Sequence, residues 1–279
     1  MFYVLGSGPA AISAAVALVN RGRPVTILDA GRTLEPERRQ ILDRLSRQEP
    51  EAWDARDLET LRGGDQKTRE GQIHVKLSYG SDFPYRDLER PLKEEDGGFH
   101  YSMARGGLSS VWGASLLPYR AEDIADWPLS IADLEPHYRA VLEFMPSTAV
   151  RDDLEHLLPS YSDRNDPLRP SAQASRFLED MAAHRDGLKK SGISFGRSRM
   201  AATASGDAKR HACVYCGRCL YGCPYSLIYS TARTLDSLLE SGNVTYRAGH
   251  VVERLEPVSD GVKIHASRTA SRRLRDLAI

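Results

Sequence analysis

Apolar residues near the N-terminus fall into two short runs, separated by a glycine-rich loop and a helical segment. The first run, at 2–5, ends directly at the loop GSGP (6–9), and the alanine-rich stretch 12–20 follows. The second run, at 24–28, is continuously apolar and has the length of a buried parallel strand. The pattern therefore predicts a strand, a loop, a helix and a second parallel strand, which together form a βαβ unit.

Two residues mark the ends of the predicted helix. Pro9 stands where a first-turn proline is tolerated, because its missing N–H would have no intrahelical partner. Gly22 is placed to end the helix, because glycine accepts the left-handed conformation common there.

After the second strand the regular alternation of strands and helices stops. Residues 33–70 are charged and helix-like, and the simplest interpretation is a solvated helical excursion. Further on, Ser130 is a candidate helix N-cap with Asp133 three residues later, and 176–191 has helical spacing. A helix end at 235–239 and short strands at 244–248, 251–255 and 262–265 complete the pattern. We therefore expect an α/β fold with a parallel sheet, interrupted by helical and loop insertions.

The glycine loop has the residue types that a dinucleotide needs. Gly6 would make the tight turn, Gly8 would let the backbone approach a pyrophosphate, and the small Ala11 would permit close packing of helix on strand. Asp29, at the end of the second strand, is suited to accept hydrogen bonds from an adenosine ribose and would repel a 2′-phosphate. FAD or NAD is thus favoured over NADP. The alternative is a structural glycine turn followed by a structural acidic residue.

A second glycine loop spans residues 105–113. Its paired glycines, Gly106 and Gly107, would bring backbone N–H groups close to a ligand, and Ser109 and Ser110 supply small hydroxyl donors. These residues alone do not separate a ligand-binding loop from a tight turn.

Composition narrows the class of protein. The 279-residue chain balances 38 Lys and Arg against 38 Asp and Glu, which speaks against a nucleic-acid partner. Its mean hydropathy is −0.44, and the longest nearly apolar run, 10–19, is short of the roughly 20 residues of a membrane-spanning helix. No transmembrane segment is expected, and in the absence of a secretory pattern at the N-terminus we expect a cytoplasmic chain.

All cysteines lie in one short run. Cys213, Cys216, Cys219 and Cys223 follow the ferredoxin spacing C-x2-C-x2-C-x3-C-P. In two-cluster ferredoxins the fourth cysteine binds the other cluster, and this sequence has no second run. Three interpretations remain: a three-iron or four-iron cluster on the first three cysteines, a zinc site, or thiols without metal. Zinc is the least favoured, because structural zinc sites separate two C-x-x-C pairs by about a dozen residues or more.

Together, the first glycine motif, the Asp29-Ala30-Gly31 triplet, the 106–110 loop, the 127–138 stretch and the cysteine run resemble the glucose-methanol-choline (GMC) oxidoreductase family, in the family's order. The resemblance implies a Rossmann-like FAD-binding domain over residues 1–279, with insertions at 33–96 and 116–229, the second carrying the cysteines. It also implies oxidation of a CH–OH group of an alcohol or sugar by FAD.

The resemblance assigns roles residue by residue. Gly6, Gly8, Ala11 and Asp29 would hold the ADP half of FAD, and Gly106, Gly107, Ser109 and Ser110 would lie against the flavin half. Val251 corresponds to the strand whose backbone meets the adenine. Some family members use an iron–sulfur cluster near this cysteine position to pass electrons onward, here to an electron-accepting protein or a quinone.

One departure from the family pattern concerns the C-terminal half, which supplies the substrate sheet and the active-site His pair in the family. This sequence stops before either, and none of its eight histidines stands in a partner motif, so the catalytic residues stay unassigned. We expect it to represent the N-terminal part of such an enzyme. The alternative is a non-catalytic flavin- or cluster-binding fragment that needs a partner chain.

Overall fold

The computed structural model describes residues 1–63, 76–85, 101–206 and 211–268. The chain divides into two compact units. Unit 1 comprises Met1–Trp112, Arg218–Pro224 and Ser230–Ile279, and unit 2 comprises Gly113–Gly217 and Tyr225–Tyr229.

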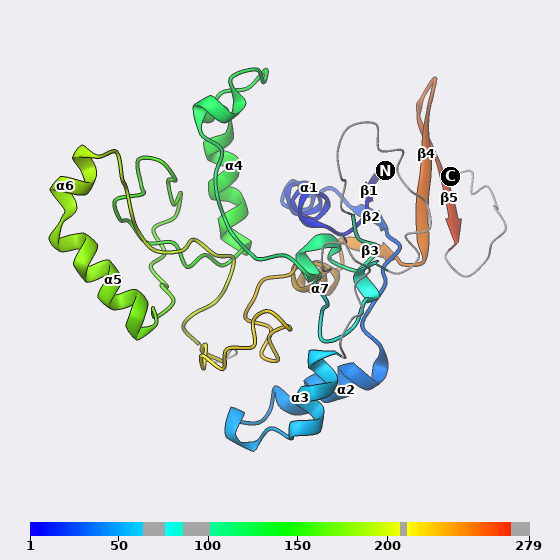
Figure 1. The fold of residues 1–279 in the computed structure, drawn as a ribbon. Helices are drawn as coiled ribbons and strands as arrows, with labels where there is room; N and C mark the ends of the chain where they lie inside the picture. Colours follow the sequence, from blue (N-terminus) through cyan, green and yellow to red (C-terminus); the bar gives the residue numbers. More distant parts are fainter. Residues whose placement is uncertain (64–75, 86–100, 207–210, 269–279) are drawn as a thin grey trace, which may run out of the picture. The chain divides into compact units, whose positions relative to one another are not determined.

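Unit 1 is built on a parallel sheet of three strands. The strands β1 (Phe2–Leu5), β2 (Val25–Leu28) and β3 (Val244–Arg247) lie in the order β1-β2-β3 (Figure 1). Val4 of β1 stands opposite Ile27 of β2, and Ile27 stands opposite Tyr246 of β3. The predicted βαβ unit and the mixed α/β class are confirmed, and a strand from the far end of the chain joins the same sheet.

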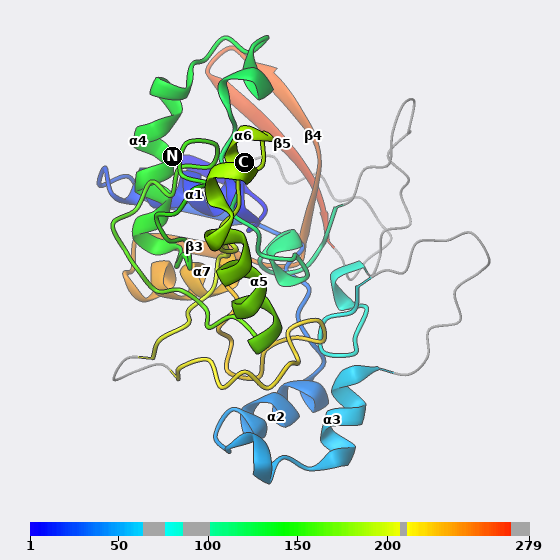
Figure 2. The ribbon, with the colours of Figure 1, turned by 60° about the vertical axis from the view of Figure 1, so that its left-hand side comes forward.

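Two helices of unit 1 pack against this sheet and against each other. They are α1 (Pro9–Val19) and α7 (Thr231–Glu240), which lie side by side in Figures 1 and 2. Their apolar side chains share one core cluster with the strands, made of Val4, Ile12, Ala15, Val25, Ile27, Leu235, Leu238 and Val244. Burial of this cluster is the main force that holds the first and last parts of the unit together.

The predicted ends of α1 are confirmed. Pro9 opens the helix, with Gly8 as the N-cap residue. Beyond the last helical residue, Val19, the chain turns at Gly22, whose φ is +68° and whose N–H donates to the carbonyl of Val19 at 2.8 Å. A glycine is favoured at that point because side chains disfavour this conformation.

The charged segment after β2 forms helices, as predicted, but one side of them is buried. α2 (Pro36–Leu45) and α3 (Ala55–Arg62) contribute Ile41, Leu42, Leu45 and Leu61 to a second core cluster. The short helix η1 (Pro50–Ala52) lies between them in the sequence, and the short helix η2 (Phe83–Tyr85) follows later in the chain. The interpretation of this segment as wholly solvated is therefore wrong. The charged residues dominate its composition, while the few apolar ones gather on one side. Residues 64–75 and 86–96 of the predicted insertion lie outside the described residues.

A β-hairpin follows β3 in unit 1. The strands β4 (His250–Val258) and β5 (Gly261–Arg268) pair antiparallel. The predicted strands 251–255 and 262–265 lie within them, and the turn residue Gly261 opens the second strand.

Unit 2 is mainly helical and irregular in its described residues. It contains η4 (Ala121–Ile124), α4 (Ile131–Phe144), α5 (Ala172–Ala183) and α6 (Arg185–Lys190). Ser130 caps α4 and exchanges hydrogen bonds with Asp133, so the predicted N-cap is confirmed as a reciprocal capping box. The predicted insertion 116–229 overlaps this unit and also includes the stretch Arg218–Pro224, which belongs to unit 1.

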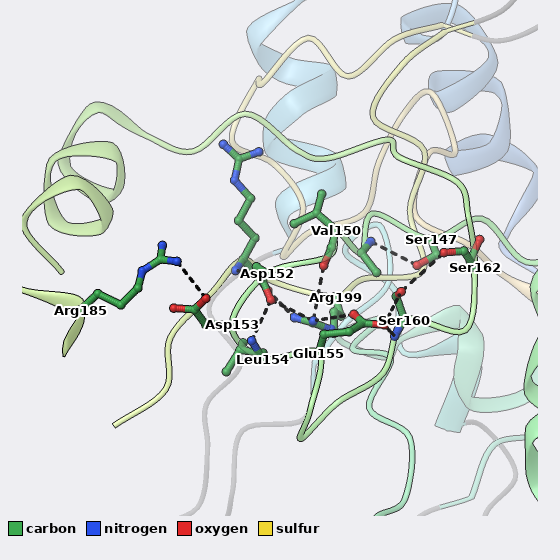
Figure 3. A network of polar contacts seen from close by, with 12 residues as sticks. Ser147, Val150, Asp152, Asp153, Leu154, Glu155, Ser160, Ser162, Arg185 and Arg199 are labelled. Atoms are coloured by element: carbon green, nitrogen blue, oxygen red, sulfur yellow. Dashed lines mark hydrogen bonds and ion pairs between the residues drawn. The ribbon is translucent and has the colours of Figure 1, made fainter. Parts of the chain in front are cut away.

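A buried arginine organises part of unit 2. Arg199 is only 4% exposed, and Figure 3 shows its guanidinium directed at the carboxylate of Asp152 and the carbonyl of Val150, at 3.0 and 3.4 Å. The carboxylate of Glu155 lies 3.6 Å from the same group. Asp152 also accepts from the backbone N–H of Arg197 at 2.7 Å, so the network ties the 150–155 loop to the 197–199 segment.

Candidate functional site

The first glycine loop lies between the end of β1 and the start of α1. The N–H of Gly6 donates to the carbonyl of Leu28 at 2.7 Å, which ties the loop to the carboxyl end of β2. The first intrahelical hydrogen bond runs from Ile12 to the carbonyl of Gly8, so Ala10 and Ala11 have no acceptor within the helix. A helix end of this kind carries a partial positive charge that favours a phosphate. Ala11 packs against the core cluster beneath it, as its small size predicted.

The second glycine loop lies against the first. It enters the short helix η3 (Gly107–Ser110), preceded by Gly106 at a φ of +93°. A Cβ added to Gly107 would stand 2.9 Å from the Cα of Gly8, closer than real Cβ contacts allow. The N–H of Gly106 also donates to the hydroxyl of Ser7 at 2.8 Å. The structure therefore brings together the two glycine pairs that the sequence singled out, although about a hundred residues separate them.

The serines of the second loop are engaged in the loop itself. Ser109 is 3% exposed, its hydroxyl donates to the carbonyl of Gly106, and it accepts from the N–H of Thr231 at 3.0 Å. The hydroxyl of Ser110 donates to the carbonyl of Arg105 at 3.0 Å. Sequence reasoning placed both hydroxyls against the flavin. In the structure, Ser109 connects η3 to the start of α7, and Ser110 closes its own loop.

Asp29 ends β2 and is 6% exposed. One of its carboxylate oxygens accepts from the hydroxyl of Ser7 and, at 2.8 Å, from the hydroxyl of Tyr246. Burial raises the pKa of Asp29, while the hydrogen bonds from Ser7, Tyr246 and the backbone of Gly31 and Ala30 act in the opposite direction. Asp29 therefore lies next to the glycine loop, and its carboxylate already accepts hydrogen bonds within the protein.

Val251 lies beside the same end of β2. The preceding residue, His250, donates its N–H to the carbonyl of Asp29 at 2.9 Å, and Gly249 donates to the carbonyl of Ala30 at 3.2 Å. Val251 is half-buried at the start of β4. The strand that the resemblance assigns to adenine thus adjoins Asp29 in the structure.

The cysteine run crosses the division between the two units. Cys213 and Cys216 belong to unit 2, whereas Cys219 and Cys223 belong to unit 1. None of the four forms a disulfide, and the carbonyl of Cys223 accepts from the hydroxyl of Tyr79 at 3.1 Å. Within the described ranges, no three His, Cys, Asp or Glu side chains are arranged to hold a metal ion. The iron–sulfur cluster therefore stays a prediction from the spacing of the cysteines.

Three residues of this site were missed by sequence reasoning. Ser7 stands between the two glycines of the motif and is 1% exposed, which makes its hydroxyl the link between Asp29 and Gly106. Thr231 donates its hydroxyl to the carbonyl of Ser7 at 2.8 Å, and Tyr246 bonds Asp29. The position of Ser7 inside the glycine motif was a usable signal. No sequence pattern connects Thr231 or Tyr246 to a loop more than two hundred residues earlier.

The fold and this site define an α/β protein in which two glycine loops meet at the carboxyl end of a parallel strand. In comparisons with known proteins, no family model matches the chain, and no curated protein matches its sequence. Over the described part of the chain, no helix combines the length and apolar character needed to cross a membrane.

Proposed function

We propose that unit 1 is a Rossmann-like domain that binds FAD, and that the protein is an FAD-dependent oxidoreductase of the GMC type acting on a CH–OH group. The observation that carries the proposal is the contact between Gly8 and Gly107, where a Cβ on the second residue would lie 2.9 Å from the first. Two loops singled out by independent sequence patterns meet there, at the N-terminus of α1 and next to Asp29.

The residues present fit a dinucleotide. A Cβ built on Gly6 meets no atom within 4 Å, so the backbone of the loop is open at this point. The N-terminus of α1 would face the pyrophosphate, and Asp29 would face the adenosine ribose. Gly106 and Gly107 would present backbone to the flavin half. Bound FAD would supply the acceptor for a hydride from the CH–OH carbon.

The rest of the proposal comes from the family resemblance. An alcohol or a sugar is the proposed substrate, and an electron-accepting protein or a quinone is the proposed acceptor. Binding of an iron–sulfur cluster by Cys213, Cys216, Cys219 and Cys223 is a further part of this proposal, as is a cytoplasmic location.

The test identifies the nucleotide that the purified chain releases on denaturation. We expect FAD, and NADP or no nucleotide from a folded sample would contradict the proposal. Gly8→Ala makes the test specific, because the structure accommodates the methyl group. Gly8 has a φ of −69°, and its nearest neighbour would be the Cα of Gly107 at 3.9 Å. The new Cβ would occupy the approach of the pyrophosphate.

We therefore expect Gly8→Ala to lose FAD while the cofactor-free protein gains about 0.4–1 kcal/mol in its free energy of unfolding. The matched control is Gly187→Ala in α6, where a Cβ would meet nothing within 4 Å. This control should retain its FAD. Equal FAD content in both variants would mean that the loop does not hold the cofactor.

A further inference from the structure

Three buried hydroxyls join the two glycine loops to the start of α7. Ser7 lies in the first loop, Ser109 in the second, and Thr231 is the first residue of α7. They are 1%, 3% and 0% exposed, so water does not compete for their hydrogen bonds. The direction of each hydroxyl is therefore set by the protein groups around it.

The hydroxyl of Thr231 holds the carbonyl of Ser7. It donates to this carbonyl at 2.8 Å and lies 3.1 Å from a second acceptor, the carbonyl of Gly106. The carbonyl of Gly106 also accepts from the hydroxyl of Ser109. Among the hydrogen bonds between described residues, none but that from Thr231 reaches the carbonyl of Ser7. The first loop thus depends on Thr231, whereas the second loop has a donor of its own.

Thr231 is itself held in place by the protein. Its N–H donates to the hydroxyl of Ser109 at 3.0 Å, and Leu235 and Leu238 anchor α7 in the core of unit 1. A β-branched side chain in a helix has few favourable χ1 rotamers. The hydroxyl of Thr231 is therefore preorganised to hold the carbonyl of Ser7.

The carbonyl of Ser7 fixes the direction of the next N–H, that of Gly8. The peptide bond between the two residues is planar and trans, so its C=O and its N–H point in opposite directions. Because the carbonyl is turned towards Thr231, the N–H of Gly8 is turned away from it. No described residue accepts a hydrogen bond from this N–H. Gly107 leaves space beside it, since a Cβ there would stand 3.5 Å from the nitrogen of Gly8.

We infer that Thr231 is a positioning residue for the nucleotide: by holding the carbonyl of Ser7, its hydroxyl keeps the N–H of Gly8 directed at the pyrophosphate. This inference rests on the proposed function, in which the first glycine loop takes the pyrophosphate. Thr231 acts without touching the nucleotide, because it is 0% exposed. Without its hydroxyl, the buried carbonyl of Ser7 would turn to find another donor, and the N–H of Gly8 would turn with it.

The test separates the hydroxyl of Thr231 from the rest of the side chain. Thr231→Val removes the hydroxyl and keeps the branched shape, whereas Thr231→Ser keeps the hydroxyl and removes the methyl group. ADP, and adenosine, which lacks both phosphates, are each titrated by calorimetry into the full chain freed of bound nucleotide. We expect Thr231→Val to bind ADP about tenfold more weakly, which corresponds to about 1.4 kcal/mol, and to bind adenosine as the native protein does. Thr231→Ser should bind ADP as the native protein does.

The matched control is Thr148→Val in unit 2. Thr148 is 1% exposed, and its hydroxyl also bonds to the backbone, accepting from the N–H of Met200 at 3.1 Å. This variant loses a comparable buried hydroxyl and should bind ADP as the native protein does. Circular dichroism verifies that each variant is folded.

A second measurement follows Gly8 in the native protein and does not depend on the folding of Thr231→Val. Nuclear magnetic resonance with isotopically labelled glycine reports the N–H signal of Gly8, which is assigned by its loss in Gly8→Ala. We expect this signal to move to lower field as ADP is added, because the N–H then donates to a charged phosphate oxygen. An unchanged Gly8 signal in native protein that binds ADP would overturn the inference.

The titrations also distinguish the inference from the proposed function. Equal losses of ADP and adenosine binding in Thr231→Val, or ADP binding by Thr231→Ser as weak as by Thr231→Val, would mean a packing role only and would overturn the inference. Native affinity for ADP in Thr231→Val would overturn it while leaving the proposed function in place. Failure of the native protein to bind either ADP or FAD would overturn the proposed function together with the inference.

Discussion

Units 1 and 2 are stabilised by different interactions. In unit 1, Ile12, Ile27 and Leu235 are all 0% exposed and come from α1, β2 and α7. In unit 2, α4, α5 and α6 contain no fully buried residue, and a buried arginine with its carboxylate partners connects two loops instead. A sheet lets distant segments share one apolar core. Unit 2 instead buries apolar side chains such as Met145, Leu227 and Tyr229, which lie outside its α-helices.

The units also differ in how closely the segments named here pack. In unit 1 the two glycine loops are in direct contact. In unit 2 a pocket of about 260 Å³ lies beside α4, where Tyr138, Val141 and Leu142 line it together with Arg199. The apolar side of α4 thus faces a pocket and not a packed core, which agrees with the absence of fully buried residues on this helix.

The largest expected effect tests the apolar core of unit 1. Ile27→Ala should lower the free energy of unfolding of this unit by about 4 kcal/mol, because it removes a fully buried side chain and leaves a cavity. Hydrogen exchange measured by mass spectrometry should show faster exchange in α1 and α7 and no change in α4.

The control for this variant is Val262→Ala on β5, where the side chain is 55% exposed. It should change stability by less than about 0.5 kcal/mol. Faster exchange in both units after Ile27→Ala would show that the two units unfold together. They would then differ in which residues they bury, but not in their stability.

A somewhat smaller effect is expected from the buried arginine of unit 2. Arg199→Ala leaves the carboxylates of Asp152 and Glu155 without their cation and should destabilise this unit by about 3 kcal/mol. Exchange should increase in the 150–155 and 197–199 segments and stay unchanged in β1 and β2.

An exposed ion pair in the same unit provides the comparison. Arg151 and Asp163 are 2.6 Å apart, with side chains 70% and 88% exposed, so Arg151→Ala should alter stability by less than about 1 kcal/mol. If both arginine substitutions lowered stability equally, burial would not make the Arg199 network more stabilising than the exposed ion pair.

The smallest effect is a difference in pH dependence between two aspartates. Burial raises the pKa of Asp29 above its ordinary 3.8, so the folded unit 1 holds this proton more tightly than the unfolded chain. Its contribution to stability falls as the pH rises from about 3.8 through the raised pKa. Hydrogen bonds from the Ser130 hydroxyl and N–H lower the pKa of Asp133 in unit 2. Its contribution is present above 3.8 and is lost as the pH falls through the lowered pKa.

Chemical unfolding across the acidic range should therefore show opposite slopes for these two contributions. Asp29→Asn should remove the first slope and Asp133→Asn the second. A slope of the same sign from both substitutions would contradict the stated causes of the two pKa shifts.

Much of the framework was predictable from local patterns. Pro9 and Gly22 mark the ends of α1 because their backbone preferences do not depend on distant residues. Ser130 and Asp133 likewise form their capping box within one helical turn. The burial of one side of α2 and α3 was not predicted, because charged residues dominate the composition of that segment and conceal its few apolar positions.

The sequence by itself determined the two glycine loops, the position of Asp29 after β2 and the spacing of the cysteines. Only the tertiary structure decided which groups these residues meet. Ser109 contacts Thr231 across 122 positions of the chain, and Tyr246 reaches Asp29 across 217. Such contacts arise because the parallel sheet and the shared core place α7 and β3 beside β2, and packing of this kind leaves no spacing signal along the chain.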